Sequence, residues 1–333
     1  MKIRNLMAVT GLVFAATPAL ALDCDEGMRA FTHDAGETCI PVDPQRIIAF
    51  DEQGITAPLY ELGAPIVGSV GRIDVNYNDG EPYLRSLLDV ANVTFENSDM
   101  SFIGNWRTPD LEVIAGLQPD LIIILDFSMD LYDQLSAVAP VVVVPESDPM
   151  LDNYRMIADA VGRLDAFEEG LAAYERSLEF ARGVLATTID DPSDVTVAFV
   201  EPTFDEGIWV TREQYTLTQV INDLGFSQPQ LVLDSEDPWS QISAEVAQQI
   251  DSDFMITTYT NIYEGDFAFD KAEAFEQSLP GWREFLHAPQ NGQVILANRE
   301  FIRPAMFQTL DRSLAIIMTN IVTKPFVPFE EPQ

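Results

Sequence analysis

The sequence has few of the residues that most often bind metal ions or act as nucleophiles. Its 333 residues include two histidines, His33 and His287, and two cysteines, Cys24 and Cys39. Neither histidine is followed three or four positions later by another histidine or a cysteine, which disfavours a metal site made of side chains. The sequence also lacks the Gly-x-Ser-x-Gly pattern that marks one common type of nucleophilic serine. It therefore gives little support for a resident metal ion or for covalent catalysis.

Basic residues are scarce as well. The chain has 18 Lys and Arg against 54 Asp and Glu, a formal net charge of −36. Nucleic-acid binding needs a basic surface, so this function class is excluded. Lysine occurs only at Lys2, Lys271 and Lys324, and every other basic residue is arginine. Because arginine suits bidentate recognition of carboxylate-like oxygen atoms, the positions of the arginines matter for any ligand.

Long apolar runs are missing beyond the N-terminus. Residues 1–21 have the form of a cleaved export signal, with Lys2 in a basic start, an apolar stretch and the small-residue sequence Ala19-Leu20-Ala21. We expect cleavage after Ala21. Asp23 directly precedes Cys24, which argues against a lipoprotein. No later segment reaches the roughly 20 apolar residues that a membrane-spanning helix needs. The mature protein is therefore expected to be exported and soluble.

The two cysteines can form only one pair. In an exported protein with an even count, the simplest expectation is a disulfide between Cys24 and Cys39. Closing a loop of about 15 residues would contribute roughly 3 kcal/mol in the chain-entropy model. We interpret this pair as a structural disulfide that stabilises two N-terminal strands, and not as a redox centre.

Short apolar strands alternate with helical segments in both halves of the chain. This order predicts α/β architecture with central parallel sheets covered on both faces. The expected strands are residues 46–50, 65–70, 121–125, 141–144, 195–200, 254–258 and 294–297. The expected helices are residues 55–62, 83–90, 110–117, 131–138, 217–224, 245–250, 275–286 and 306–322.

A helical region of about forty residues separates the two halves. Ile157, Val161 and Leu164 belong to a set of apolar residues that recur every three or four positions. This pattern predicts one long helix, or two helices broken near Gly162, as a rigid connection between two lobes. The predicted division is residues 22–149 for the N-terminal lobe, 150–190 for the connecting helix, 191–323 for the C-terminal lobe and 324–333 for a tail.

Two stretches, 133 positions apart, repeat one layout. In each, a Trp precedes a Glu by six residues, and an Asp follows that Glu by eight residues and opens an apolar run. The matching residues are Trp106, Glu112 and Asp120 in the first stretch, and Trp239, Glu245 and Asp253 in the second. The repeat predicts a loop carrying a Trp, a two-turn helix and a parallel strand, built twice. Two similar lobes imply a cleft between them.

Arginine and aromatic residues are predicted in loops or at helix starts near the carboxyl ends of the strands. Ligands of open α/β sheets bind in such loops. A cleft lined by these side chains would suit a bulky, partly aromatic or oxygen-rich anionic ligand. The candidates are Arg72, Trp106, Arg107, Trp209, Arg212, Tyr215, Trp239, Tyr259, Tyr263, Arg299 and Arg303.

Glu112 and Glu245 have two interpretations from spacing alone. Each could be a carboxylate in the first turn of a helix, where the helix dipole favours negative charge. Alternatively, they could form a pair of charges, one on each lobe, displayed to a partner with two matching cations.

These features resemble the periplasmic substrate-binding proteins of iron-siderophore and cobalamin ABC importers. The resemblance covers nearly all of the expected mature chain. It is carried by residues 44–50, 61–63, 109–123 and 239–245, together with the long helical region. It implies two α/β lobes joined by one long α-helix, in a periplasmic, monomeric protein that is not an enzyme.

The resemblance also implies roles for individual residues. By position, Glu112 and Glu245 match glutamates that dock on arginines of a membrane permease dimer. The positions that match ligand-facing aromatic and arginine side chains are Trp106, Trp239, Arg107 and Arg303.

The function that this resemblance implies is capture of a ferric siderophore. The iron would arrive inside its chelator, so the protein would need no cofactor and no metal ligands of its own. A corrinoid or a haem is the alternative ligand within the same class. An exported α/β enzyme is the alternative from another class, and it would require a nucleophile, metal cluster or phosphate loop that the sequence lacks.

Overall fold

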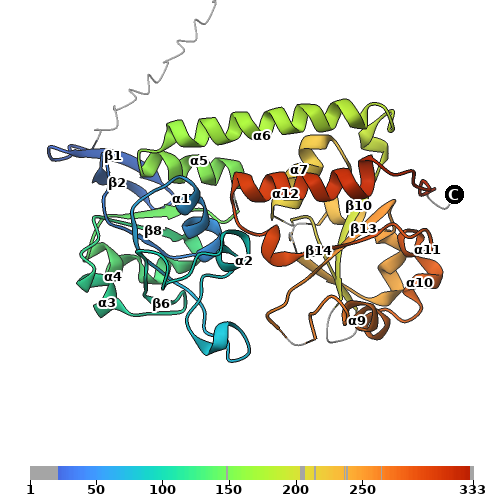
Figure 1. The fold of residues 1–333 in the computed structure, drawn as a ribbon, viewed down its shortest axis with the longest axis horizontal. Coiled ribbons are helices and arrows are strands. Elements are labelled where there is room, and N and C mark those ends of the chain that lie inside the picture. The colour runs from blue at the N-terminus through green and yellow to red at the C-terminus, as the bar shows by residue number, and fades with distance from the viewer. Residues whose placement is uncertain are drawn as a thin grey trace, which may run out of the picture.

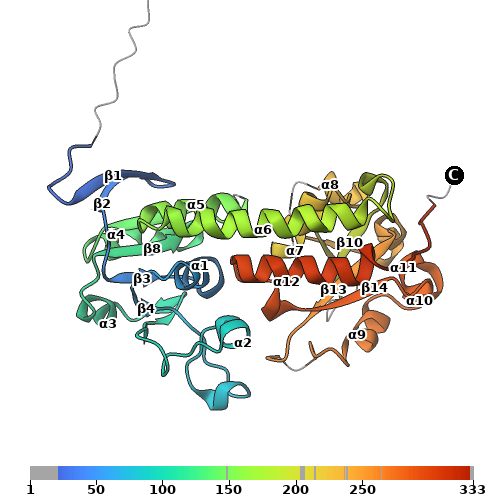
Figure 2. The ribbon, with the colours of Figure 1, turned by 45° about the horizontal axis from the view of Figure 1, so that its top comes forward.

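Two α/β lobes lie side by side in the computed structural model (Figure 1). The structure describes residues 22–147, 149–202, 207–213, 215–235, 237, 239–263 and 265–330. The expected export signal, residues 1–21, lies outside the described residues. Helix α6 (Leu164–Leu185) runs along both lobes, with α12 (Phe307–Ile317) beside it (Figures 1 and 2). The predicted fold class is confirmed.

The N-terminal lobe is built on a five-stranded sheet in which every neighbouring pair is parallel. Its central strands are continuous apolar runs that are buried on both faces, as expected for a sheet covered by helices. The strand order is β5 (Ser101–Phe102), β4 (Ile66–Ser69), β3 (Ile47–Ala49), β8 (Leu121–Leu125) and β9 (Val141–Val144). The helices are η1 (Glu52–Thr56), α1 (Ala57–Glu61), η2 (Asn78–Gly80), α2 (Leu87–Ala91), α3 (Leu111–Gly116), η3 (Asp126–Leu131) and α4 (Tyr132–Ser136).

The C-terminal lobe has a mixed five-stranded sheet. Its order is β12 (Trp239–Ile242), β11 (Ile208–Thr211), β10 (Val197–Pro202), β13 (Phe254–Tyr259) and β14 (Val294–Asn298). Strands β10, β13 and β14 are parallel, whereas β11 and β12 are antiparallel to their neighbours. Only a few residues separate β10 from β11, and so short a connection permits only antiparallel pairing. The sequence pattern did not predict this outer ribbon.

Helices cover both faces of the second sheet. They are α7 (Tyr215–Leu224), α8 (Gln230–Leu233), η5 (Ala244–Ile250), α9 (Lys271–Ser278), α10 (Trp282–Phe285), α11 (His287–Gln290), η6 (Arg299–Phe301), α12 and η7 (Met318–Val322). Among the described residues, no helix has the length and apolar character needed to span a membrane.

The connecting region consists of two helices, α5 (Met150–Ala160) and α6. Gly162 separates them with a φ of +66°, a left-handed conformation that favours glycine. Of the two sequence-based alternatives, the broken helix is therefore correct. One apolar core cluster runs from the first sheet through α5, α6 and α12 to the second sheet, with Ile47, Ile157, Leu310 and Phe254 among its members. The shared core ties both lobes to the same helical layer.

The two repeated stretches occupy equivalent positions in the two sheets. Helix α3 leads into β8, and η5, a 3₁₀-helix, leads into β13. Asp120 accepts hydrogen bonds from the backbone N–H groups of Gln45 and Arg46, next to β3. Asp253 likewise accepts from the backbone and hydroxyl of Thr196, next to β10. The repeated Asp therefore fixes the start of a neighbouring strand in each lobe.

The repeat is less regular around its two tryptophans. Trp106 lies in the turn of a hairpin formed by β6 (Gly104–Asn105) and β7 (Thr108–Pro109). Trp239 begins strand β12, so the expectation of a loop position is wrong for this residue. Its backbone is extended because it pairs with Thr211 across the outer ribbon.

The N-terminal strand pair and its disulfide are both present. Strands β1 (Met28–His33) and β2 (Gly36–Pro41) form an antiparallel hairpin, and Cys24 is bonded to Cys39. The hairpin lies against β9, where the backbone N–H of Asp34 donates to the carbonyl of Val143 at 3.2 Å. The disulfide prediction is confirmed.

Helix α6 passes close to the start of α12 at Gly170. A Cβ atom at Gly170 would lie 2.3 Å from Cδ2 of Phe307. Phe307 in turn packs against Tyr154 and Phe167, with ring centroids 5.0 and 5.4 Å away. The absence of a side chain at Gly170 is therefore what allows this aromatic cluster to form beneath the helix.

Gly170→Ala is expected to destabilise the protein by about 1–3 kcal/mol, because the added methyl group overpacks the ring of Phe307. Gly183→Ala on the same helix is the matched control, since nothing lies within 4 Å of its Cβ position. There the better helix propensity of alanine should stabilise by about 0.5–1 kcal/mol. Urea unfolding of both variants measures the difference, and a stabilised Gly170→Ala variant would contradict the packing argument.

Candidate ligand-binding site

The loops at the carboxyl ends of the two sheets meet between the lobes. Arg72 follows β4 in the N-terminal lobe, and its Nη1 atom donates to the hydroxyl of Tyr263, which follows β13 in the C-terminal lobe, at 3.4 Å. Arg85, just before α2, pairs with Glu300, just after β14, at 3.0 Å. These contacts place the strand ends of both lobes at one interlobe surface, where open α/β folds bind their ligands.

Arg72 is held within its own lobe by a buried carboxylate. Its Nε atom donates to Oε1 of Glu52 at 3.0 Å, and the Glu52 side chain is only 1% exposed. Burial raises the pKa of Glu52, and the charge of Asp51 adds to this effect, while Arg72 opposes it. Oε2 of Glu52 is buried without a hydrogen-bond partner. Much of the charge of Arg72 is therefore already balanced.

Arg299 lies in a similar network at the carboxyl ends of β10, β13 and β14. Its Nε atom donates to the hydroxyl of Thr258 and its Nη2 atom pairs with Asp266, both at 3.0 Å. Lys271, which is buried, pairs with Asp266 and lies 3.3 Å from Glu201. Arg299 thus keeps only part of its side chain available for a ligand. This pairing weakens the expectation that the ligand is strongly anionic.

Arg303 and Tyr215 form a stacked pair in the C-terminal lobe. The guanidinium carbon lies 4.4 Å from the ring centroid, and Nη2 also donates to the phenol oxygen. Burial raises the pKa of Glu146 in the N-terminal lobe, Asp126 raises it further, and Arg303 lowers it. Arg303 therefore acts electrostatically across the lobes. Its Nε atom is buried without a partner.

The aromatic candidates form two groups, one in each lobe. Trp106 packs edge-on against Phe127 at 5.2 Å, and the guanidinium of Arg107 lies 4.5 Å above the Trp106 ring. Trp209 and Trp239 share one face of the β11–β12 ribbon, because Trp209 lies opposite Gln241 and Thr211 lies opposite Trp239. Each of these two tryptophans is 39% exposed. Two large rings exposed on the same face of one ribbon form an apolar patch, and such patches often mark binding sites.

The remaining candidates have less evident roles. Arg212 donates to the backbone carbonyl of Ser235 at 3.0 Å, which ties it to a loop of its own lobe. Tyr259 ends β13 and is half-buried. Glu112 and Glu245 are both exposed in the first turns of α3 and η5. Within the described residues, no three His, Cys, Asp or Glu side chains come together in a metal-binding group.

Sequence reasoning missed Arg85, Glu300 and Phe127. The predicted helix over residues 83–90 included Arg85, but α2 begins only at Leu87 because Ser86 adopts a φ of +66°. Arg85 is therefore free to point at the other lobe. Glu300 is one of 54 acidic residues, and no local pattern distinguishes it. Phe127 is the second residue after β8 and lies in η3, so it could have been included by the same rule as the other strand-end candidates.

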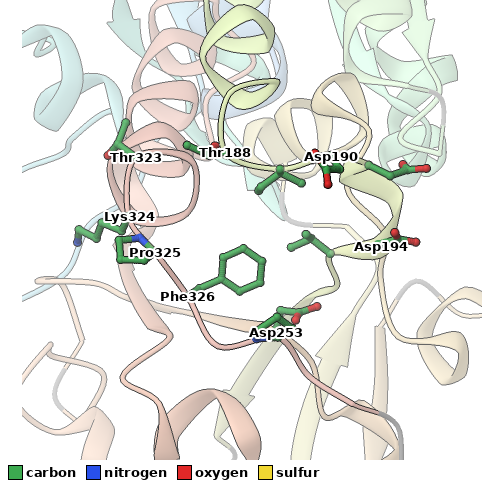
Figure 3. A pocket seen from close by; sticks show the side chains of 12 residues that line it. Thr188, Asp190, Asp194, Asp253, Thr323, Lys324, Pro325 and Phe326 are labelled. Atoms are coloured by element: carbon green, nitrogen blue, oxygen red, sulfur yellow. The ribbon is translucent and has the colours of Figure 1, made fainter.

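A separate cavity of about 620 Å³ lies in the C-terminal lobe. It is next to Asp253, at the start of β13, whereas the interlobe surface is at the other end of that strand. Figure 3 shows Phe326 projecting into it from the C-terminal segment. That segment is bonded to the lobe, since the backbone N–H groups of Val327 and Phe329 donate to Gln293 and Asp253, both at 2.7 Å. The cavity is thus distinct from the interlobe site.

Stability should depend on pH through the carboxyl groups of the interlobe surface. Burial raises the pKa of Asp51, Glu52 and Glu146, so folding favours their protonated forms. Their destabilising effect is present at neutral pH and is relieved as the pH falls through their folded pKa values. Glu300 behaves oppositely: burial raises its pKa, but hydrogen bonds and charge from Arg85 outweigh this and lower the pKa below 4.5. Its contribution is lost as the pH falls through the folded pKa.

We therefore expect the melting temperature to rise as the pH is lowered from neutral toward the raised folded pKa values of Asp51, Glu52 and Glu146, and to fall at still lower pH as Glu300 is protonated. The high negative charge of the chain reinforces the first trend, because partial protonation reduces self-repulsion. Differential scanning calorimetry at constant ionic strength measures this profile. A melting temperature that decreases steadily from pH 8 downward would contradict it.

Comparison with known proteins gives consistent matches. A profile of the family described as periplasmic binding protein matches residues 78–300. The Fe(3+)-citrate-binding protein YfmC of Bacillus subtilis is 24% identical over 277 residues, 82% of this chain and 79% of the relative. The ferric enterobactin-binding periplasmic protein FepB of Escherichia coli is 25% identical over 238 residues, 68% of this chain and 70% of the relative.

Solved structures show the same fold. Staphylococcus aureus SirA complexed with staphyloferrin B superposes with a TM-score of 0.70 at 20% identity, covering 88% of this chain and 98% of that one. The FhuD protein from S. pseudintermedius superposes with a TM-score of 0.67 at 21% identity, covering 90% of this chain and 99% of that one.

Proposed function

The chain belongs to the periplasmic binding protein family, and from this premise we propose that it captures a ferric siderophore between its lobes and delivers it to an ABC importer. The family is one of transport binding proteins and not of enzymes. Two of the relatives are named for binding ferric enterobactin and Fe(3+)-citrate, and SirA was solved with staphyloferrin B. Ferric chelates are therefore the ligand class that these relatives support.

The observation that carries the proposal is the pair of exposed tryptophans, Trp209 and Trp239, on one face of the outer ribbon. Exposed indole rings can cover the organic surface of a chelator. The Arg303–Tyr215 pair and the Trp106–Arg107 pair supply further aromatic surface and guanidinium donors. Such groups bind a preformed chelate through its ligand shell, and the iron needs no protein ligand and no resident cofactor.

The proposal extends to the setting in which the protein works. The mature chain starts at Leu22, is not a lipoprotein, and acts as a monomer in the periplasm. It docks on a permease dimer through Glu112 and Glu245, both of which are exposed. N-terminal sequencing and light scattering of protein recovered from the periplasm test the first three statements. A lipid-modified cysteine or a stable dimer would contradict them.

Tryptophan-fluorescence titration tests the ligand class. The purified protein is titrated with ferric hydroxamate, ferric catecholate and ferric citrate complexes. Cobalamin and haem, the alternative ligands, are titrated separately in the same way. Binding of at least one ferric chelate at micromolar concentration is the expected result. Binding of only cobalamin or haem, or no binding at all, would overturn the siderophore proposal.

A further inference from the structure

Glu300 forms several hydrogen bonds between the two lobes. Its carboxylate accepts three hydrogen bonds from Arg85 at 3.0–3.3 Å and one from the hydroxyl of Ser86 at 2.7 Å, both in the N-terminal lobe. Thr260 of its own lobe donates a further bond at 3.0 Å. The Arg85 and Glu300 side chains are only 5% and 2% exposed. The interaction is therefore a buried ion pair that joins the lobes, and both carboxylate oxygens of Glu300 accept hydrogen bonds in it.

Two more residues extend this contact toward the candidate site. The guanidinium of Arg85 lies 5.6 Å from the ring centroid of Tyr263, and the hydroxyl of Tyr263 accepts from Arg72. The order Glu300, Arg85, Tyr263, Arg72 therefore alternates between the C-terminal and N-terminal lobes. We call these four residues the interlobe ladder. Arg72 and Tyr263 are both among the residues that the sequence predicts at the ligand site.

The chain after Glu300 is fastened to the N-terminal lobe as well. The backbone N–H of Ala305 donates to the carbonyl of Gln53 at 2.9 Å. Glu61 of α1 accepts from the backbone N–H groups of Phe307 and Gln308 at 2.7 and 2.9 Å, and so caps the first turn of α12 from the other lobe. These backbone bonds fix where α12 begins, while the ladder lies beyond them at the strand ends.

A change in lobe spacing would break the ladder at a high energetic cost. It would leave Glu300 and Arg85 without their charged partner in a region that water scarcely reaches, and an unpaired buried charge is strongly unfavourable. Hydrogen bonds between charged groups are also stronger and more directional than neutral ones. The ladder therefore favours one spacing and one orientation of its side chains.

We propose that Glu300 is a positioning residue for the ligand site: through Arg85 and Tyr263 it sets the spacing of the two lobes and the orientation of Arg72. The effect on ligand affinity rests on the proposed function, whereas the effect on lobe spacing does not. If only about one molecule in ten kept the competent spacing after the ladder was broken, ligand affinity would fall about tenfold.

Lobe spacing can be measured without any ligand. Spin labels are attached to Gln134→Cys in α4 and Ala272→Cys in α9, two exposed helical positions in different lobes, with the native disulfide intact. Pulsed electron resonance then gives the distribution of distances between them. We expect a narrow distribution in the otherwise unchanged protein and a broader one, with a shifted mean, in Glu300→Ala.

Two further variants make the result interpretable. Glu300→Ala leaves Arg85 unpaired and can fail to fold, so Arg85→Met combined with Glu300→Met removes both charges together and avoids an unpaired buried ion. Glu179→Gln, at an exposed position of α6, is the control for loss of one carboxylate. We expect the paired methionine variant to fold with a broadened distribution, and the control to match the parent protein.

The proposal is overturned if the folded methionine variant keeps the parent distance distribution. Affinity is measured in parallel with whichever ferric chelate binds in the fluorescence titration, and an unchanged affinity in the variant would also overturn it. If the spacing changes but the parent protein binds no chelate, the ladder stands and the siderophore proposal fails. The two proposals can thus be separated.

Discussion

Uptake of the ferric chelate is expected to fall to background when Glu112 and Glu245 are both replaced with alanine, while chelate affinity stays unchanged. Both side chains are exposed at the first turns of equivalent short helices, one on each lobe. In the described part of the chain, neither forms an ion pair. Their removal should therefore not disturb the fold, but it would remove both negative charges that the proposed docking presents to the permease.

Loss of complementary charges at an interface affects recognition strongly when both partners depend on them. Transport of radioactive iron chelate into cells that carry the cognate permease measures the effect, and titration of the purified variant measures affinity. The matched control is Glu175→Ala with Glu179→Ala on α6, which removes the same charge from another exposed surface. Failure of the docking variant to bind chelate, or normal uptake by it, would show that the two glutamates have another role.

Trp209→Ala combined with Trp239→Ala is expected to weaken chelate binding by about 100-fold or more. An aromatic residue at the centre of a binding surface commonly contributes at least about 2 kcal/mol, and about 1.4 kcal/mol corresponds to a factor of ten. Both rings lie on one exposed face of an edge ribbon, so their removal should change the melting temperature little. Isothermal titration calorimetry measures affinity, because the substitution removes much of the fluorescence signal.

Phe180→Ala provides the control for this experiment. Phe180 is 72% exposed on α6, which makes it another large aromatic side chain in contact with water. Its replacement should leave affinity unchanged. A double tryptophan variant that binds as tightly as the Phe180→Ala protein would remove the observation on which the ligand proposal depends.

The sequence predicted strands β8 and β9 of the N-terminal lobe because a strand buried on both faces is a short, continuous apolar run. Leu121–Leu125 and Val141–Val144 are continuous apolar runs, and both are buried strands. The outer ribbon of the C-terminal lobe contains no such continuous apolar run. Trp239–Ile242 is only partly buried and begins with a tryptophan that the repeat had suggested for a loop. A partly exposed strand such as this one forms by pairing with a distant segment, which a local pattern does not encode.

The candidate site was predicted only in part, for a similar reason. The rule that ligands bind at the carboxyl ends of strands selected Arg72, Arg299 and Arg303, and the structure places all three at the interlobe surface or close to it. It did not reveal which of them are already paired with acids. That depends on Glu52 and Asp266, which are distant in sequence and belong to a very large acidic set. Charge pairing is therefore a property of the folded chain.

The β1–β2 hairpin and its disulfide affect the conditions under which the chain can be produced in folded form. Strand β9 is an outermost strand of the first sheet and consists of four consecutive valines, and the hairpin lies against it. An uncovered strand of this composition is a template for aggregation. In a reducing cytoplasm the disulfide between Cys24 and Cys39 does not form, so the hairpin that covers β9 is held less firmly. Recombinant chains made there are expected to accumulate in inclusion bodies unless they are secreted or refolded with an oxidant.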